Sequence, residues 1–107
     1  MPNVLFVCSR NQWRSRTAEA IYRRDQRLRV RSAGTASSAR IRLSAGAVAW
    51  ADLVFVMEAR HRDILVERFG AHLGEAEVIV LEIPDEYRYQ DPELVELLRD
   101  GVEPYLS

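Results

Sequence analysis

One cysteine, one arginine and one serine are spaced so that they could carry phosphoryl-transfer chemistry. Cys8 is followed by five residues and then by Arg14 and Ser15. Five residues allow the backbone to curl around one phosphate and aim successive N–H groups at its oxygens. The planar Arg14 guanidinium can bind two of those oxygens, and a Cys8 thiolate can attack the phosphorus. Segment 8–15 is therefore the candidate site.

A strand, a loop and a helix are predicted around this segment. Residues 3–7 are short and apolar, which is typical of a buried strand. Residues 8–14 are polar and form the loop, and residues 15–26 have helical apolar spacing. A helix N-terminus presents unpaired N–H groups and positive partial charge, so it favours a bound phosphate and the thiolate form of Cys8. The structural alternative for Cys8 is a small buried residue at a strand end.

The rest of the chain alternates between strands and helices. This alternation predicts a parallel sheet with helices on both faces, in one domain spanning residues 1–107. The last helix has the clearest start signal, with Asp91 as N-cap and Pro92 at the first helical position. Ser44 is a second candidate N-cap. The expected strands are 28–32, 53–57 and 78–83, and the expected helices are 45–51, 58–69 and a helix from 92 to about 104.

Composition excludes several kinds of protein and site. The single cysteine, Cys8, excludes an internal disulfide and a zinc site built from several thiolates. His61 and His72 lack metal-ligand spacing, and we expect both to be exposed helix or loop residues. No metal and no cofactor is predicted. No apolar run approaches the ~18 residues of a membrane span, and no secretory leader pattern is present, so the expected location is the cytoplasm.

Charge is unevenly distributed along the chain. Every basic residue is arginine, and residues 1–50 carry ten of them against only Glu19 and Asp25. A basic first half suits an anionic ligand. Residues 51–107 carry five arginines against fourteen acidic residues, which argues against broad nucleic-acid binding.

Three segments resemble the low-molecular-weight protein tyrosine phosphatases. VLFVCSRNQWRS, followed after Arg16 by TAEAIY, is similar to that family's signature. SAGT at 32–35 and ADLVFVME at 51–58 also resemble segments of the family. The resemblance implies a flavodoxin-like, doubly wound, four-stranded parallel sheet. It also implies phosphate monoester hydrolysis through a phosphocysteine intermediate.

The resemblance assigns roles to residues of the loop. Cys8 would be the nucleophile, and Arg14 would bind the transferred phosphoryl group and stabilise its oxygens. Asn11, Ser15 and Ser32 resemble the residues that hold the loop in shape by hydrogen bonds. The complete set expected to contact phosphate is Ser9, Arg10, Asn11, Gln12, Trp13, Arg14 and Ser15.

The reaction also needs an acid that protonates the leaving group and then a base that activates water. The family carries an aspartate in an Asp-Pro-Tyr sequence before the last helix. Asp85 lies in IPDEY after the fourth predicted strand, whereas Asp91 is followed by Pro92. We favour Asp85 because the N-cap role already accounts for Asp91. Asp91 remains the alternative.

The chain departs from the family's pattern at the loop and behind it. The family usually has Gly and Cys at the positions of Arg10 and Trp13, so we expect a strained Arg10 backbone. The stretch between SAGT and ADLVFVME is much reduced. In the family this stretch supplies an aromatic wall and a histidine that supports the loop, and neither has a clear counterpart. Trp13, Tyr87 and Tyr89 are either replacement walls or ordinary rim and core aromatics.

The preferred hypothesis is a cysteine-dependent phosphatase acting on protein phosphotyrosine. Alternatives are a phosphatase or phosphodiesterase for a nucleotide or other small phosphate ester, and a phosphate-binding module without catalysis. An arsenate reductase would need further cysteines or an external thiol, because Cys8 has no partner in the chain. The expected partner is a phosphorylated protein or a small phosphate ester, and the oligomeric state is left open.

Overall fold

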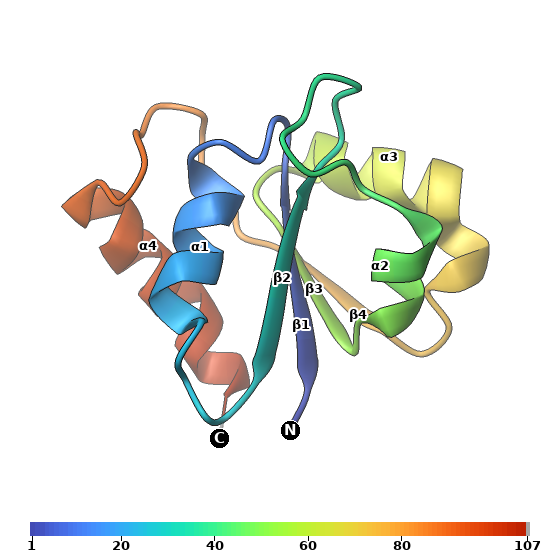
Figure 1. Cartoon of the computed structure of the whole chain (residues 1–107), viewed down its shortest axis with the longest axis horizontal. Coiled ribbons are helices and arrows are strands. Elements are labelled where there is room, and N and C mark those ends of the chain that lie inside the picture. The colour runs from blue at the N-terminus through green and yellow to red at the C-terminus, as the bar shows by residue number, and fades with distance from the viewer. Residues whose placement is uncertain (107) are drawn as a thin grey trace.

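The computed structural model describes residues 1–106, which contain one four-stranded parallel sheet (Figure 1). Its strand order is β2-β1-β3-β4, and every neighbouring pair is parallel. The predicted flavodoxin-like, doubly wound fold is confirmed. The strands are β1 (Asn3–Cys8), β2 (Arg29–Gly34), β3 (Leu53–Val56) and β4 (Glu77–Val80).

Helices cover both faces of the sheet. Figure 1 shows α1 and α4 on one side of the strands and α2 and α3 on the other. None of the helices formed by residues 1–106 is long and apolar enough to span a membrane. The α-helices are α1 (Arg14–Tyr22), α2 (Ala45–Trp50), α3 (Ala59–Phe69) and α4 (Pro92–Val102), and the 3₁₀ turns are η1 (Gly70–His72) and η2 (Glu103–Tyr105).

The central strand β1 supplies side chains to both cores. Successive residues of a strand point to opposite faces, so Val4, Phe6 and Cys8 join the core under α1 and α4. Leu5 and Val7 join the core under α2 and α3. All five are buried, and burying each large apolar side chain is worth about 1.5–3 kcal/mol. This double burial fixes the strand end that carries Cys8.

Helix boundaries follow local capping. The Ser44 hydroxyl accepts a hydrogen bond from the Ala47 N–H (3.2 Å), and Asp91 Oδ1 accepts one from the Glu93 N–H (2.9 Å). Both predicted N-caps are confirmed. Helix α4 ends at Val102, two residues before the predicted end near residue 104, and Pro104 lies in η2.

The helix expected over 15–26 is shorter than predicted, because α1 ends at Tyr22. Asp25 Oδ1 accepts a hydrogen bond from the Arg27 N–H (2.9 Å), and the Asp25 N–H bonds to the Tyr22 carbonyl (3.0 Å). These local bonds compete with the helical pattern. Strand β2 extends two residues past Ser32, because Gly34 is still paired with Cys8.

Gly34 lies where β2 passes directly beneath the candidate loop. A Cβ atom at this position would lie 2.5 Å from the Ser9 carbonyl oxygen and 2.7 Å from the Ala39 Cβ. Backbone atoms cannot move aside as a flexible side chain can. Only glycine therefore allows this close approach of β2 to the loop.

We expect Gly34→Ala to lower the free energy of unfolding by about 1–3 kcal/mol, the usual cost of overpacking. The matched control is Gly46→Ala in α2, where an added Cβ meets no atom within 4 Å. Alanine is the better helix former, so the control should be neutral or slightly stabilising. Urea unfolding of both variants measures the difference. Equal stabilities would contradict the close approach.

Candidate active site

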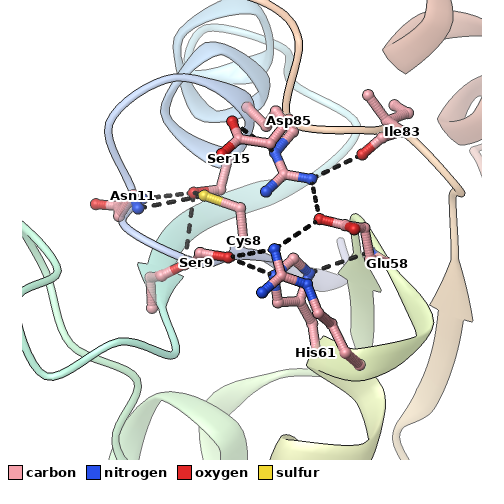
Figure 2. Close-up of polar contacts among 11 residues, drawn as sticks. Cys8, Ser9, Asn11, Ser15, Glu58, His61, Ile83 and Asp85 are labelled. Carbon is pink, nitrogen blue, oxygen red and sulfur yellow. Dashed lines mark hydrogen bonds and ion pairs between the residues drawn. The ribbon is translucent and has the colours of Figure 1, made fainter.

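The candidate site lies where the strand order diverges at the carboxyl ends of the strands, the usual ligand position in such sheets. Cys8 ends β1, Glu58 follows β3, and Asp85 follows β4. Figure 2 shows these residues gathered around the loop. Cys8 and Asp85 border a cavity of about 290 Å³. Its lining residues are Cys8, Ser9, Arg10, Gln12, Trp13, Arg14, Arg60 and Asp85.

The Cys8 sulfur is held by two hydrogen-bonding groups of the loop and α1. Its Sγ lies 2.9 Å from Ser15 Oγ, and the Asn11 backbone N–H donates to it at 3.2 Å. Asn11 Nδ2 donates to Ser15 Oγ at 2.7 Å (Figure 2). Because Ser15 Oγ accepts that bond, its own proton can be donated either to the sulfur or to the Ala33 carbonyl, which lies at 3.4 Å. The arrangement suits a thiolate that accepts two hydrogen bonds.

The strained residue of the loop is Asn11 and not Arg10. Asn11 has φ 56°, whereas Arg10 is absent from the positive-φ residues among 1–106. The expectation of a strained Arg10 is therefore wrong. Asparagine tolerates the left-handed region better than most residues. The Arg40 backbone and side chain also hold the neighbouring carbonyls, with Arg40 N donating to Arg10 O (3.0 Å) and Nε to Asn11 O (3.1 Å).

Arg14 is buried, with 2% of its side chain exposed, and one of its nitrogens is fully occupied. Nη1 donates to Glu58 Oε2 at 2.6 Å and to the Ile83 carbonyl at 2.8 Å. Nε lies 3.7 Å from Asp85 Oδ1, and Nη2 has no hydrogen bond to any residue within 1–106. Arg14 lines the cavity, and a guanidinium edge such as the one formed by Nε and Nη2 can bind two oxygens of an anion.

Glu58 is a site residue that sequence analysis did not single out. It accepts hydrogen bonds from Arg14 and from Arg60 Nη2 (3.1 Å). Partial burial alone would raise the pKa of Glu58, but the bonds from Arg60 and Arg14 outweigh burial and lower it to about 2. Glu58 is therefore ionised at neutral pH. It neutralises part of the charge that Arg14 brings into the interior.

His61 is fully buried, which overturns the expectation of an exposed histidine. Nδ1 accepts a hydrogen bond from the Glu58 backbone N–H (3.1 Å), so the neutral ring carries its proton on Nε2 and donates to Ser9 Oγ (2.9 Å). Burial lowers the pKa of His61 to about 4, and the charges of Arg14 and Arg60 act in the same direction. A histidine thus supports the loop from α3.

Ser9 receives two hydrogen bonds and keeps its own proton for a third partner. Its Oγ accepts from His61 Nε2 and from Arg60 Nη2 (3.1 Å). Because Ser9 lines the cavity, its hydroxyl proton can be donated to a phosphoryl oxygen.

The two candidate acids occupy different surroundings. Asp85 lines the cavity with about half of its side chain exposed, whereas the Asp91 carboxylate caps α4. The N-cap position of Asp91 agrees with its predicted role at the start of α4. The catalytic role of Asp85 remains a prediction.

Solved structures with the same fold cover nearly the whole chain. A mutant YwlE from Bacillus subtilis is 26% identical, with 98% of this chain and 99% of that chain covered and a TM-score of 0.70. The tyrosine phosphatase Wzb from Escherichia coli K30 is 22% identical (98% and 96% covered, TM-score 0.75). The low-molecular-weight protein tyrosine phosphatase SP-PTP from Streptococcus pyogenes is 18% identical (98% and 91% covered, TM-score 0.77).

This chain is a structural relative of the low-molecular-weight tyrosine phosphatases. No family model matches it, and no curated protein sequence matches it either. What the comparisons show it to share with these proteins is the fold.

One expectation about the candidate site needs correction. Ser32 makes no direct hydrogen bond to the loop within residues 1–106; its hydroxyl bonds to Glu19 on α1. Glu19 lies 3.9 Å from Arg40, which in turn holds Asn11. Ser32 is therefore connected to the loop only indirectly, through its hydrogen bond to Glu19 and the pairing of Glu19 with Arg40. It lies two residues before Gly34, where β2 contacts the loop directly.

The aromatic residues divide between the cavity and other surroundings. Trp13 is 43% exposed and lines the cavity. Tyr87 packs against the core under α4, and Tyr89 stacks with the Arg16 guanidinium at 4.7 Å. Trp13 is thus an aromatic wall of the cavity, whereas Tyr87 and Tyr89 are core and rim residues. Residues 1–106 contain no cluster of three or more His, Cys, Asp or Glu side chains that could hold a metal ion.

We expect the stability of the protein to fall as the pH drops from about 6.5 to about 4 because of His61. The unfolded chain binds a proton on this histidine near pH 6.5, whereas the folded protein does so only near pH 4. This difference is worth up to about 3 kcal/mol below that window. His61→Gln and His61→Asn remove the titration, and each can keep one of the two hydrogen bonds.

Urea unfolding at a series of pH values measures this effect. The stability difference between wild type and each variant should shrink as the pH falls through the window. A difference that is constant from pH 7 to pH 4 would show that His61 is not held neutral by the fold.

Proposed function

We propose that this protein is a cysteine-dependent phosphatase that hydrolyses phosphate monoesters through a phosphocysteine intermediate. One observation carries the proposal: Cys8 and the buried Arg14 line the same cavity, and the Arg14 Nη2 has no hydrogen-bond partner within residues 1–106. The helix α1 begins at the same loop and adds positive partial charge. Such a site combines a nucleophile with donors for the oxygens of a transferred phosphoryl group.

In the first step the phosphoryl group occupies the loop, where Arg14 and the backbone N–H groups bind its oxygens. The Cys8 thiolate forms a bond to phosphorus while the bond from phosphorus to the ester oxygen breaks. Asp85 gives its proton to the departing oxygen, as general acids do for poor leaving groups. The Ser15 hydroxyl, 2.9 Å from the sulfur, holds the thiolate in place.

In the second step a water molecule attacks the phosphorus of the phosphocysteine. The Asp85 carboxylate takes a proton from that water, and the bond between phosphorus and sulfur breaks. Cys8 leaves as a thiolate that again accepts hydrogen bonds from Ser15 and from the Asn11 N–H. Inorganic phosphate is released, and the enzyme returns to its starting state.

The first candidate substrate is a phosphotyrosine side chain of a protein. The related proteins from Escherichia coli K30 and Streptococcus pyogenes are tyrosine phosphatases, and Trp13 offers an aromatic ring an apolar surface beside the loop. The second candidate is phosphoarginine, a phosphoramidate in which a P–N bond breaks in place of the ester P–O bond and Asp85 protonates the leaving nitrogen, because YwlE is an arginine phosphatase. The free Cys8 thiol suits a reducing compartment such as the cytoplasm.

Cys8→Ser should abolish hydrolysis of an aryl phosphate, because a serine hydroxyl is a far weaker nucleophile at neutral pH. Wild type should turn the substrate over and should be inhibited by vanadate. Phosphate binding by Cys8→Ser, followed by calorimetry, is the control for an intact loop. Wild type that binds phosphate without turnover would identify a binding module and contradict the proposal.

Asp85→Asn should reduce kcat for a poor leaving group by about 10²–10⁴-fold, the usual contribution of a general acid. A good leaving group such as 4-nitrophenolate should be much less affected in the first step. Asp91→Asn is the matched control, because it keeps an N-cap residue while removing the same charge. If Asp91→Asn is the crippled variant, the assignment of Asp85 is wrong.

A further inference from the structure

Two arginines besides Arg14 line the cavity above Cys8. Arg10 comes from the loop after β1, and Arg60 comes from the first turn of α3. Residues 51 apart in the sequence (Ser9 and Arg60) are joined here by a hydrogen bond. Three arginines, Arg10, Arg14 and Arg60, thus line one cavity of about 290 Å³, which is larger than a single phosphoryl group.

The phosphoryl group does not need the two outer arginines. Its oxygens are already provided with the backbone N–H groups of the loop and with the Nε–Nη2 edge of Arg14. Within residues 1–106, Arg10 forms no ion pair and no side-chain hydrogen bond, so its charge is not used to hold the loop together. An arginine with no structural partner at the mouth of a ligand cavity is available to a ligand.

Arg60 is held in position and is still able to bind an anion. Its Nη2 donates to Ser9 Oγ and to Glu58 Oε2, both at 3.1 Å. These bonds hold the guanidinium over the cavity although 59% of the side chain is exposed. Its Nε and Nη1 have no hydrogen bond to any described residue, which leaves N–H donors for a second group. Because the Arg60 side chain is already held in place before a ligand binds, less conformational entropy is lost on binding.

We infer that the substrate carries a second anionic group, a phosphate or a carboxylate, a few bonds from the scissile phosphate, and that Arg10 and Arg60 bind this group. The inference rests on the proposed phosphatase function, and it favours small phosphate esters with two anionic groups over phosphotyrosine as the substrate class. Both arginines share the cavity with Cys8, so the second anion must lie close to the phosphorus. An acidic residue beside a phosphotyrosine is separated from the phosphate by the whole tyrosine side chain.

The decisive probes are two aryl phosphates of the same shape, 3-carboxyphenyl phosphate and 3-carbamoylphenyl phosphate. They differ in the charge of one substituent. Wild type should prefer the carboxylate by about five- to twentyfold in kcat/KM, mostly through KM, since the value of one or two charge-assisted hydrogen bonds at a partly exposed site is modest. The preference should shrink as the salt concentration rises.

Arg10→Gln and Arg60→Gln should each reduce this preference. Arg60→Gln also removes the hydrogen bonds to Ser9 and Glu58. The resulting change in kcat/KM for the neutral probe measures this structural effect, and a further loss for the carboxylate probe measures the loss of preference. Arg62→Gln is the matched control, because Arg62 is an exposed arginine of the same helix that pairs with Asp63 and does not line the cavity. Its preference should equal that of wild type.

Equal kcat/KM values of wild type for the two probes would overturn the inference, as would a preference that survives in both variants. The inference would also be overturned if wild type showed no preference between the two small probes but preferred acidic phosphotyrosine peptides to the same peptides with glutamine in place of glutamate. That result would favour a protein substrate. Calorimetric binding of 3-carboxybenzyl and 3-carbamoylbenzyl phosphonate separates this question from catalysis. If neither phosphate is hydrolysed, the proposed function fails, and the ratio of phosphonate Kd values still decides whether the second-anion site exists.

Discussion

Arg14 carries a positive charge with 2% of its side chain exposed, and the rest of the site is arranged around that charge. A buried charge is tolerated only where other groups pair with it and satisfy its donors. Glu58 at the end of β3 and the Ile83 carbonyl after β4 supply those partners. The strand order places β1 beside β3, so a loop after β1 can reach both. The ends of three strands are thereby joined through one guanidinium.

The same charge dictates the polarity of the groups behind the loop. Glu58 is ionised and shared between Arg14 and Arg60. Burial is the main reason that a protonated His61 is disfavoured, and the charges of Arg14 and Arg60 add to that cost, so the ring is neutral. A neutral ring with Nδ1 occupied can only donate through Nε2, and this donation orients Ser9. The Ser9 hydroxyl in the loop is thus oriented by the neutral state of His61 on α3.

Features encoded within a short stretch could be predicted from the sequence. The strand, loop and helix around Cys8 follow from local apolar patterns. The start of α4 follows from Asp91 as N-cap and Pro92 at the first helical position. Glu58 and His61 lie 44 and 52 residues from their partners Arg14 and Ser9, and no local spacing links residues so far apart. The residue with a positive φ could not be predicted either. Arginine at position 10, where the related family has glycine, does not indicate which residue of the loop adopts the left-handed conformation, and in the structure it is Asn11, with φ 56°.

Substrate selection in this cavity depends more on charge than on apolar enclosure. Apolar walls recognise a ring in proportion to the area they cover, at about 25 cal/mol per Å². Among the cavity-lining residues of 1–106, Trp13 is the one aromatic, and 43% of it is exposed. A ring bound there would lose little contact with water. In the second-anion site inferred above, Arg10 and Arg60 would instead recognise a feature that most phosphate monoesters lack. Discrimination between monoesters must therefore come from what the substrate carries beside its phosphoryl group.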